Sequence, residues 1–136
     1  MKKNVLLVDD SNIDTIINEK IISSLGLVKE VHHAENGEQA LKIFNLYQSG
    51  TIEIPDIILL DLNMPVMDGF GFIQAFQALN FPNKEKVLIV IVTSSDDPSD
   101  IQLAKNLGIK YFLTKPLSSA SVQSIIEQEF NNSAAA

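Results

Sequence analysis

Short runs of apolar residues with little polar alternation recur along the chain, and they constrain its fold more than any other feature. The clear runs are Val5–Val8, Ile57–Leu60, Val87–Val92 and Tyr111–Leu113, and a weaker one lies at Val28–His33. Short runs rich in Val, Ile and Leu are typical of strands that are buried on both faces, as in a parallel sheet. The runs therefore predict a sheet that is covered on both sides.

The segments between these runs have the apolar spacing of helices. The first repeats every fourth residue at Ile13, Ile17, Ile21 and Leu25, after the capping residue Ser11 and before Gly26. Further helices are predicted over 36–48, from Asp68-Gly69 to Pro82, from Asp97-Pro98 to Gly108, and over 122–130. Strand and helix thus alternate five times, and this alternation predicts an α/β fold because parallel strands need long crossovers.

The length and the apolar runs also bound the organisation of the chain. A chain of 136 residues has the size of one domain, which we expect to span 1–130, with 131–136 as a disordered tail. The longest apolar run is far shorter than the ~20 residues that cross a bilayer, and the N-terminus has no signal-peptide pattern. We therefore expect a soluble cytoplasmic protein with no membrane contact.

Polar side chains suited to chemistry follow the predicted strands. They are Asp9 and Asp10 after the first run, Asp61 after Ile57–Leu60, Thr93 at the end of Val87–Val92, and Lys115 after the last run. Crossovers are right-handed, so the carboxyl ends of all five strands are expected along one edge, where open α/β sheets bind ligands. Each residue alone has a commoner explanation as a cap, turn or loop residue, but their combination predicts a site.

The charges of this site indicate its chemistry. Three aspartates at close range repel one another unless a cation lies among them. Carboxylate oxygens favour Mg²⁺ over zinc, and the chain has no cysteine and a net charge of −7. A carboxylate can accept a phosphoryl group, whose oxygens Mg²⁺, the Lys115 ammonium and the Thr93 hydroxyl would neutralise. The scattered basic residues predict no direct nucleic-acid contact.

Motifs around these residues resemble those of bacterial response-regulator receiver domains. They are Val-Asp-Asp-Ser at 8–11, Leu-Leu-Asp-Leu-Asn-Met-Pro at 59–65 with Met67-Asp68-Gly69, Val92-Thr93-Ser94 and Thr114-Lys115-Pro116. The resemblance implies a flavodoxin-like (βα)₅ three-layer sandwich with a five-stranded parallel sheet in the order 2-1-3-4-5. It also implies a stand-alone signalling domain that is no conventional enzyme, since it catalyses only its own phosphorylation and dephosphorylation.

The resemblance assigns roles to the acidic residues and the lysine. Asp61 matches the phosphoacceptor and Asp10 a direct Mg²⁺ ligand. Asp9 is expected to assist the metal directly or through water, and Asn63 to supply a backbone carbonyl. Lys115 matches the active-site cation, so Asp61, Thr93 and Lys115 are the residues expected to carry the transfer.

The same resemblance implies a switch and a set of partners. Thr93 matches the switch hydroxyl, and Phe112 stands where related proteins carry a switch aromatic. The phosphoryl donor is expected to be a phosphohistidine of a sensor histidine kinase or a histidine phosphotransfer protein. The signal is expected to pass to an unknown downstream protein by contact or by onward transfer, from a monomer or weak dimer.

Two other functions use the same chemistry or the same fold. A phosphohydrolase of the haloacid-dehalogenase type also forms an aspartyl phosphate, but its nucleophile motif is Asp-x-Asp, whereas position 63 is Asn. An unphosphorylated interaction module of this fold is the second alternative, and the complete set of site residues argues against it.

The first predicted helix has more apolar residues than one buried face requires. The stripe of Ile17, Ile21 and Leu25 is expected to face the sheet. Ile13 and Ile16 would then lie beside it, exposed next to Asp9 and Asp10. In receiver domains this helix docks the phosphohistidine protein, so the resemblance makes Ile13 and Ile16 a candidate docking surface.

Overall fold

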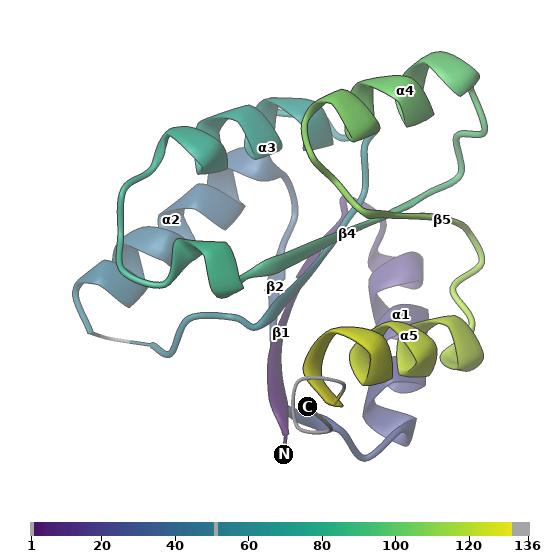
Figure 1. Cartoon of the computed structure of the whole chain (residues 1–136), viewed down its shortest axis with the longest axis horizontal. Helices are drawn as coiled ribbons and strands as arrows, with labels where there is room; N and C mark the ends of the chain where they lie inside the picture. The colour runs from purple at the N-terminus through teal and green to yellow at the C-terminus, as the bar shows by residue number, and fades with distance from the viewer. Residues whose placement is uncertain (1, 51, 132–136) are drawn as a thin grey trace.

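The computed structural model describes residues 2–50 and 52–131, and these residues form a five-stranded parallel sheet flanked by helices (Figure 1). The strands are β1 (Lys3–Val8), β2 (Val28–Ala34), β3 (Ile57–Leu60), β4 (Leu88–Thr93) and β5 (Tyr111–Thr114). They pair in the order β2-β1-β3-β4-β5, and each pair is parallel. The predicted flavodoxin-like topology is confirmed, while the predicted tail lies, from residue 132 on, outside the described residues.

Helices follow the strands in the predicted alternation. They are α1 (Asn12–Ser24), α2 (Gly37–Gln48), α3 (Gly69–Ala78), α4 (Pro98–Asn106) and α5 (Ser119–Ile126), with short 3₁₀ and π turns at Lys84–Lys86 and Glu127–Asn131. Each α-helix in the described ranges begins after a polar residue whose side chain accepts a backbone N–H bond. Every described helix falls short of the length and apolarity that a membrane span requires.

Helix α3 ends earlier than predicted. Its last residue is Ala78 rather than one next to Pro82. The Lys84 ammonium donates to the carbonyls of Gln77 and Leu79 at 2.7 and 2.6 Å. These bonds satisfy backbone oxygens that the end of a helix leaves without an intrahelical partner.

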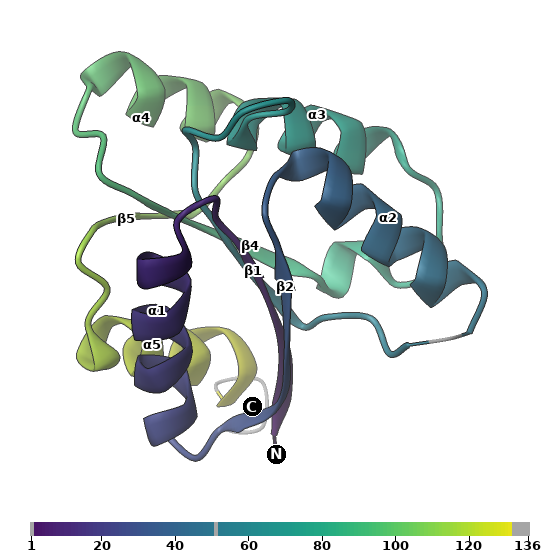
Figure 2. The same cartoon turned by 180° about the vertical axis from the view of Figure 1, so that it is seen from behind.

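The helices lie on both sides of the sheet, which explains why the strands are apolar along their whole length. α1 and α5 lie side by side on one face, and α2, α3 and α4 cover the other (Figures 1 and 2). Successive strand residues enter opposite cores: Leu6 and Ile58 pack on the side of α2 and α3, and Leu7 and Ile57 on the side of α1 and α5.

The orientation of α1 corrects one prediction. Ile17, which was expected to face the sheet, is 45% exposed, whereas Asn18 and Ile22 are buried. The buried stripe therefore runs through Asn18, Ile22 and the half-buried Leu25. Ile21 and Leu25, which were also predicted to face the sheet, are partly buried against the core, so the prediction is wrong only for Ile17.

Candidate functional site

The acidic residues predicted from the sequence meet at the carboxyl edge of the sheet. β1 and β3 are neighbours in the sheet, with Val8 opposite Leu60. The residues that follow these strands, Asp9 and Asp61, are therefore adjacent as well. The Asp61 amide donates to the Val8 carbonyl at 2.9 Å, which extends the ladder one residue beyond β3.

Three carboxylates form a compact cluster at this edge. One oxygen from each of Asp9, Asp10 and Asp61 lies within 4.8 Å of the others. Asp9 and Asp61 are buried, and Asp10 is exposed. Burial raises the pKa of Asp61 above its ordinary value; the Lys115 charge opposes this shift and the Asp9 charge adds to it. A cluster of hard oxygen donors fits a divalent cation, which would relieve the repulsion.

Lys115 follows β5, and its ammonium reaches into the acidic cluster. Its Nζ lies 2.9 Å from Asp9 Oδ2 and 3.5 Å from Asp61 Oδ2. A further carboxylate, that of Asp14 in the first turn of α1, lies 2.8 Å from the same nitrogen. Burial favours the neutral amine, but hydrogen bonds to Asp14 and Asp9 and the charge of Asp61 outweigh it and raise the pKa of Lys115. The site therefore holds a lysine that stays charged at neutral pH.

Backbone amides orient the two buried carboxylates. Asp61 Oδ1 accepts a hydrogen bond from the Leu62 amide at 2.8 Å, and Asp9 Oδ1 accepts one from the Ser11 amide at 2.9 Å. In each residue the other oxygen, Oδ2, faces Lys115. Asp61 thus has one oxygen fixed by the backbone and one directed toward the ammonium.

The chain turns tightly after Asp61. The Gly69 amide donates to the Leu62 carbonyl at 2.9 Å, and a Cβ on Gly69 would lie only 2.5 Å from the Asp61 carbonyl oxygen. The contact with the backbone beneath the acidic cluster therefore requires glycine at position 69. Asn63 is exposed in this loop, and its backbone amide favours the charged form of Asp61.

Thr93 and Phe112 lie on the β4–β5 side of the site. Thr93 is fully buried, and among the described residues its Oγ1 accepts a bond from the Ser95 amide at 3.2 Å. The Thr93 carbonyl accepts from the Lys115 amide at 2.8 Å, which ties the end of β4 to the lysine. Phe112 lies opposite Ile91 and packs, half-buried, against the core on the side of α2 and α3.

The first turn of α1 contributes both a predicted feature and one that the sequence analysis missed. Ile13 and Ile16 are 71% and 56% exposed, so their predicted exposure is confirmed. Asp14 was not predicted as a site residue. The spacing Ser11-x-x-Asp14 is that of a helix-capping pair, and nothing in the sequence connects Asp14 with Lys115.

The arrangement agrees with comparisons to known proteins. The family of the response regulator receiver domain matches residues 5–127. A probable chemotaxis protein CheY from Rhizobium etli is 33% identical over 129 residues, which cover 95% of this chain and 93% of that protein. The crystal structure of a two component response regulator from Cytophaga hutchinsonii has a TM-score of 0.84 at 31% identity, over 96% of this chain and 99% of that one. A chain of the CheX–CheY–BeF₃–Mg²⁺ complex from Borrelia burgdorferi has a TM-score of 0.76 at 26% identity, over 94% and 89%. The chain therefore belongs to the response regulator receiver domain family.

Proposed function

We propose that this receiver domain accepts a phosphoryl group on Asp61, in a Mg²⁺-dependent reaction in the cytoplasm, from a phosphohistidine of a sensor histidine kinase or a histidine phosphotransfer protein. The observation that carries the proposal is the setting of Asp61. Its carboxylate is buried, one oxygen is held by the Leu62 amide, and the other lies 3.5 Å from Lys115 Nζ.

The transfer makes and breaks one bond at phosphorus. A carboxylate oxygen of Asp61 attacks the phosphorus, and an acyl phosphate bond forms. The P–N bond to the donor histidine breaks, and the imidazole leaves with the electron pair and takes up a proton. Negative charge on the transferring oxygens needs neutralisation at this moment, and Lys115 supplies a fixed positive charge beside Asp61.

The metal ligands are proposed from the acidic cluster. Asp9, Asp10 and Asp61 would hold Mg²⁺ together with the Asn63 carbonyl, since hard oxygen donors are what this ion prefers. When bound, Mg²⁺ supplies charge that offsets the carboxylates and the phosphoryl oxygens. Asp9 and Asp61 are held in place for this task by the Ser11 and Leu62 amides.

The response to phosphorylation is proposed to begin at Thr93. Its hydroxyl accepts from the Ser95 amide, and its proton is available to a phosphoryl oxygen on Asp61. A shift of Thr93 toward Asp61 would alter the packing between β4 and β5, where Phe112 lies opposite Ile91. Phe112 is proposed to report the change by a rotation of its ring, since it has no hydroxyl to bond.

A docking surface for the phosphoryl donor and a route for the output are proposed. Ile13 and Ile16, exposed in the first turn of α1, would dock the phosphohistidine protein beside Asp9 and Asp10. The phosphorylated domain would then bind a downstream protein by contact or pass the phosphoryl group on Asp61 to another histidine. The relative from Borrelia burgdorferi was solved as a complex of CheX and CheY with BeF₃ and Mg²⁺, which supports signalling through a protein contact. A haloacid-dehalogenase activity is not favoured, because the motif here is Asp61-x-Asn63.

The test is direct labelling. The chain is incubated with acetyl phosphate and Mg²⁺, and mass spectrometry should find an acid-stable, base-labile phosphoryl group on Asp61. Asp61→Asn, which is nearly isosteric, should take up none, while EDTA should suppress labelling of the wild type. Equal labelling of Asp61→Asn would remove Asp61 as the acceptor.

A further inference from the structure

Asp14 has a contact that its place in the helix does not explain. In a capping pair the acidic residue bonds back to the amide of the capping residue. Here the Ser11 amide donates to Asp9 Oδ1 instead, at 2.9 Å, while the Asp14 amide donates to Ser11 Oγ at 3.2 Å. The Asp14 carboxylate is therefore not needed by the helix terminus, and its Oδ2 lies 2.8 Å from Lys115 Nζ.

The ammonium of Lys115 has three carboxylate neighbours at unequal distances. A lysine ammonium offers three N–H groups. Its neighbours are Asp14 at 2.8 Å, Asp9 at 2.9 Å and Asp61 at 3.5 Å. The shortest distance is to Asp14 and the longest is to the proposed acceptor. Asp14 therefore holds the ammonium on the side of α1, and a short bond from Lys115 to a phosphoryl oxygen on Asp61 would compete with this contact.

Asp14 differs from the other two carboxylates in what else it can bind. Asp9 and Asp61 belong to the cluster that can share a cation, and Asp14 is outside that set. Asp14 would therefore remain a partner of Lys115 when a cation is held by the cluster. The Asp14 side chain is also 38% exposed, so water can solvate its charge when Lys115 moves toward Asp61.

We propose that Asp14 is a positioning residue that holds the Lys115 ammonium toward α1 and so competes with the phosphoryl group for it. The inference rests on the proposed function of Asp61 and deepens it. Asp14 would lower the affinity of the site for a phosphoryl group and slow its uptake. Removing the Asp14 charge should then raise the affinity of the site for a phosphoryl group and the rate of its uptake. If Asp14 instead supported the active position of Lys115, its removal would lower both.

Four variants separate this role from general effects of charge. Asp14→Asn removes the charge and keeps the shape, and Asp14→Glu keeps the charge with a longer side chain. Glu19→Gln makes the same change in net charge on the same helix, where Glu19 pairs with His33 rather than with the site. Asp14→Ala, which also removes the acceptor oxygen, gives a second test if the amide side chain retains part of the contact.

Two measurements are made at saturating Mg²⁺. The first is the affinity for beryllofluoride, a phosphoryl analogue, followed by NMR. Asp14→Asn and Asp14→Ala should bind it about three- to tenfold more tightly, as expected for removal of a partly exposed ion pair. The second is the rate of labelling, which should rise more for dianionic acetyl phosphate than for monoanionic phosphoramidate. Asp14→Glu and Glu19→Gln should match the wild type.

The outcomes distinguish this inference from the proposed function. If the wild type is labelled but Asp14→Asn and Asp14→Ala bind beryllofluoride equally or more weakly, competition by Asp14 is wrong and the function of Asp61 stands. An equal gain in Glu19→Gln would likewise overturn it, because net charge alone would then be the cause. If the wild type neither binds beryllofluoride nor is labelled, the proposed function fails and the inference fails with it.

Discussion

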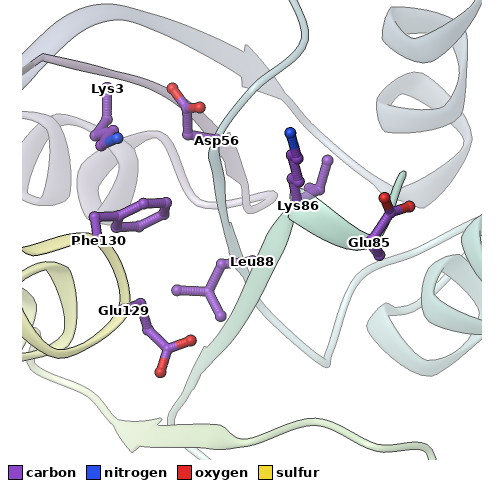
Figure 3. A pocket seen from close by; sticks show the side chains of 8 residues that line it. Lys3, Asp56, Glu85, Lys86, Leu88, Glu129 and Phe130 are labelled. Atoms are coloured by element: carbon purple, nitrogen blue, oxygen red, sulfur yellow. The ribbon is translucent and has the colours of Figure 1, made fainter. Parts of the chain in front are cut away.

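The two edges of the sheet differ in how their charged side chains are paired and buried. At the carboxyl edge three acidic side chains contact the single ammonium of Lys115, which is only 16% exposed. At the amino edge a hollow of about 380 Å³ is lined by charges of both signs, among them Lys3, Asp56 and Glu129 (Figure 3). There Lys3 lies 4.2 Å from the centre of the Phe130 ring, and Glu129 bonds to Lys110 and Tyr111.

The edges differ in how deeply their charges are buried and in the balance of positive and negative charge, rather than in the number of charges. Charges at the amino edge are paired locally or face solvent, where water and salt weaken their interactions. At the carboxyl edge Asp9 and Asp61 are buried together, and their negative charge exceeds the positive charge of Lys115. The site is therefore suited to bind a cation and a transferable anion. The hollow at the amino edge therefore does not mark the reactive site, and the carboxyl edge is the one suited to chemistry.

Loss of the central cation should have the largest effect. Lys115→Ala leaves Asp9, Asp14 and Asp61 without their shared partner, and the rate of labelling should fall by about 10²–10³-fold. Thr93→Ala should retain labelling and lose the conformational response, measured by NMR at Phe112. Lys110→Ala, which removes an exposed lysine bonded to Glu129, is the control. Identical defects in Lys115→Ala and Thr93→Ala would contradict the division of roles.

Loss of the apolar surface beside the site should have a smaller and more selective effect. Ile13→Ser and Ile16→Ser should each slow transfer from the cognate phosphohistidine protein by about three- to tenfold, since each removes apolar area from the docking contact. Labelling by acetyl phosphate, which needs no docking, should be unchanged. Leu46→Ser removes a comparably exposed apolar residue on α2 and should affect neither reaction. Equal slowing with both donors would show that the two isoleucines are needed for the fold.

The crowding of charge at the carboxyl edge should also appear as a pH-dependent stability. Burial raises the folded-state pKa of Asp61, so the charged form destabilises the fold above that pKa. The penalty is absent below the pKa of the unfolded chain, where Asp61 is protonated in both states. Asp61→Asn should therefore raise the melting temperature at neutral pH, and the gain should shrink as the pH falls. Added Mg²⁺ should reduce the gain by stabilising the wild type; a gain independent of pH and Mg²⁺ would rule out charge crowding.

The sequence predicted the structure well where a residue pattern is compatible with only one kind of element. Apolar runs alternating with helical segments predicted the parallel sheet, because strands covered on both faces need apolar residues at every position. The site was predictable because parallel strands end at one edge, which brings Asp9 and Asp61 together. The face of α1 was predicted only in part: Ile21 and Leu25 pack against the core, but Asn18 is buried while Ile17 is exposed. Asp14 was missed because it is 101 residues from Lys115 in the sequence, and only the fold brings the two side chains together.

The smallest effect is expected at the amino edge. Lys29 pairs with Glu53 at 2.8 Å, a distance equal to that between Lys115 and Asp14, but the two side chains are 50% and 63% exposed. Water and salt screen such a pair, and fixing two long side chains costs conformational entropy. Lys29→Gln should therefore leave the melting temperature within the error of repeated melts, and labelling by acetyl phosphate unchanged. If Lys29→Gln slowed labelling as Lys115→Ala does, ion-pair distance rather than burial would govern the contribution of a charge, and the contrast between the two edges would be wrong.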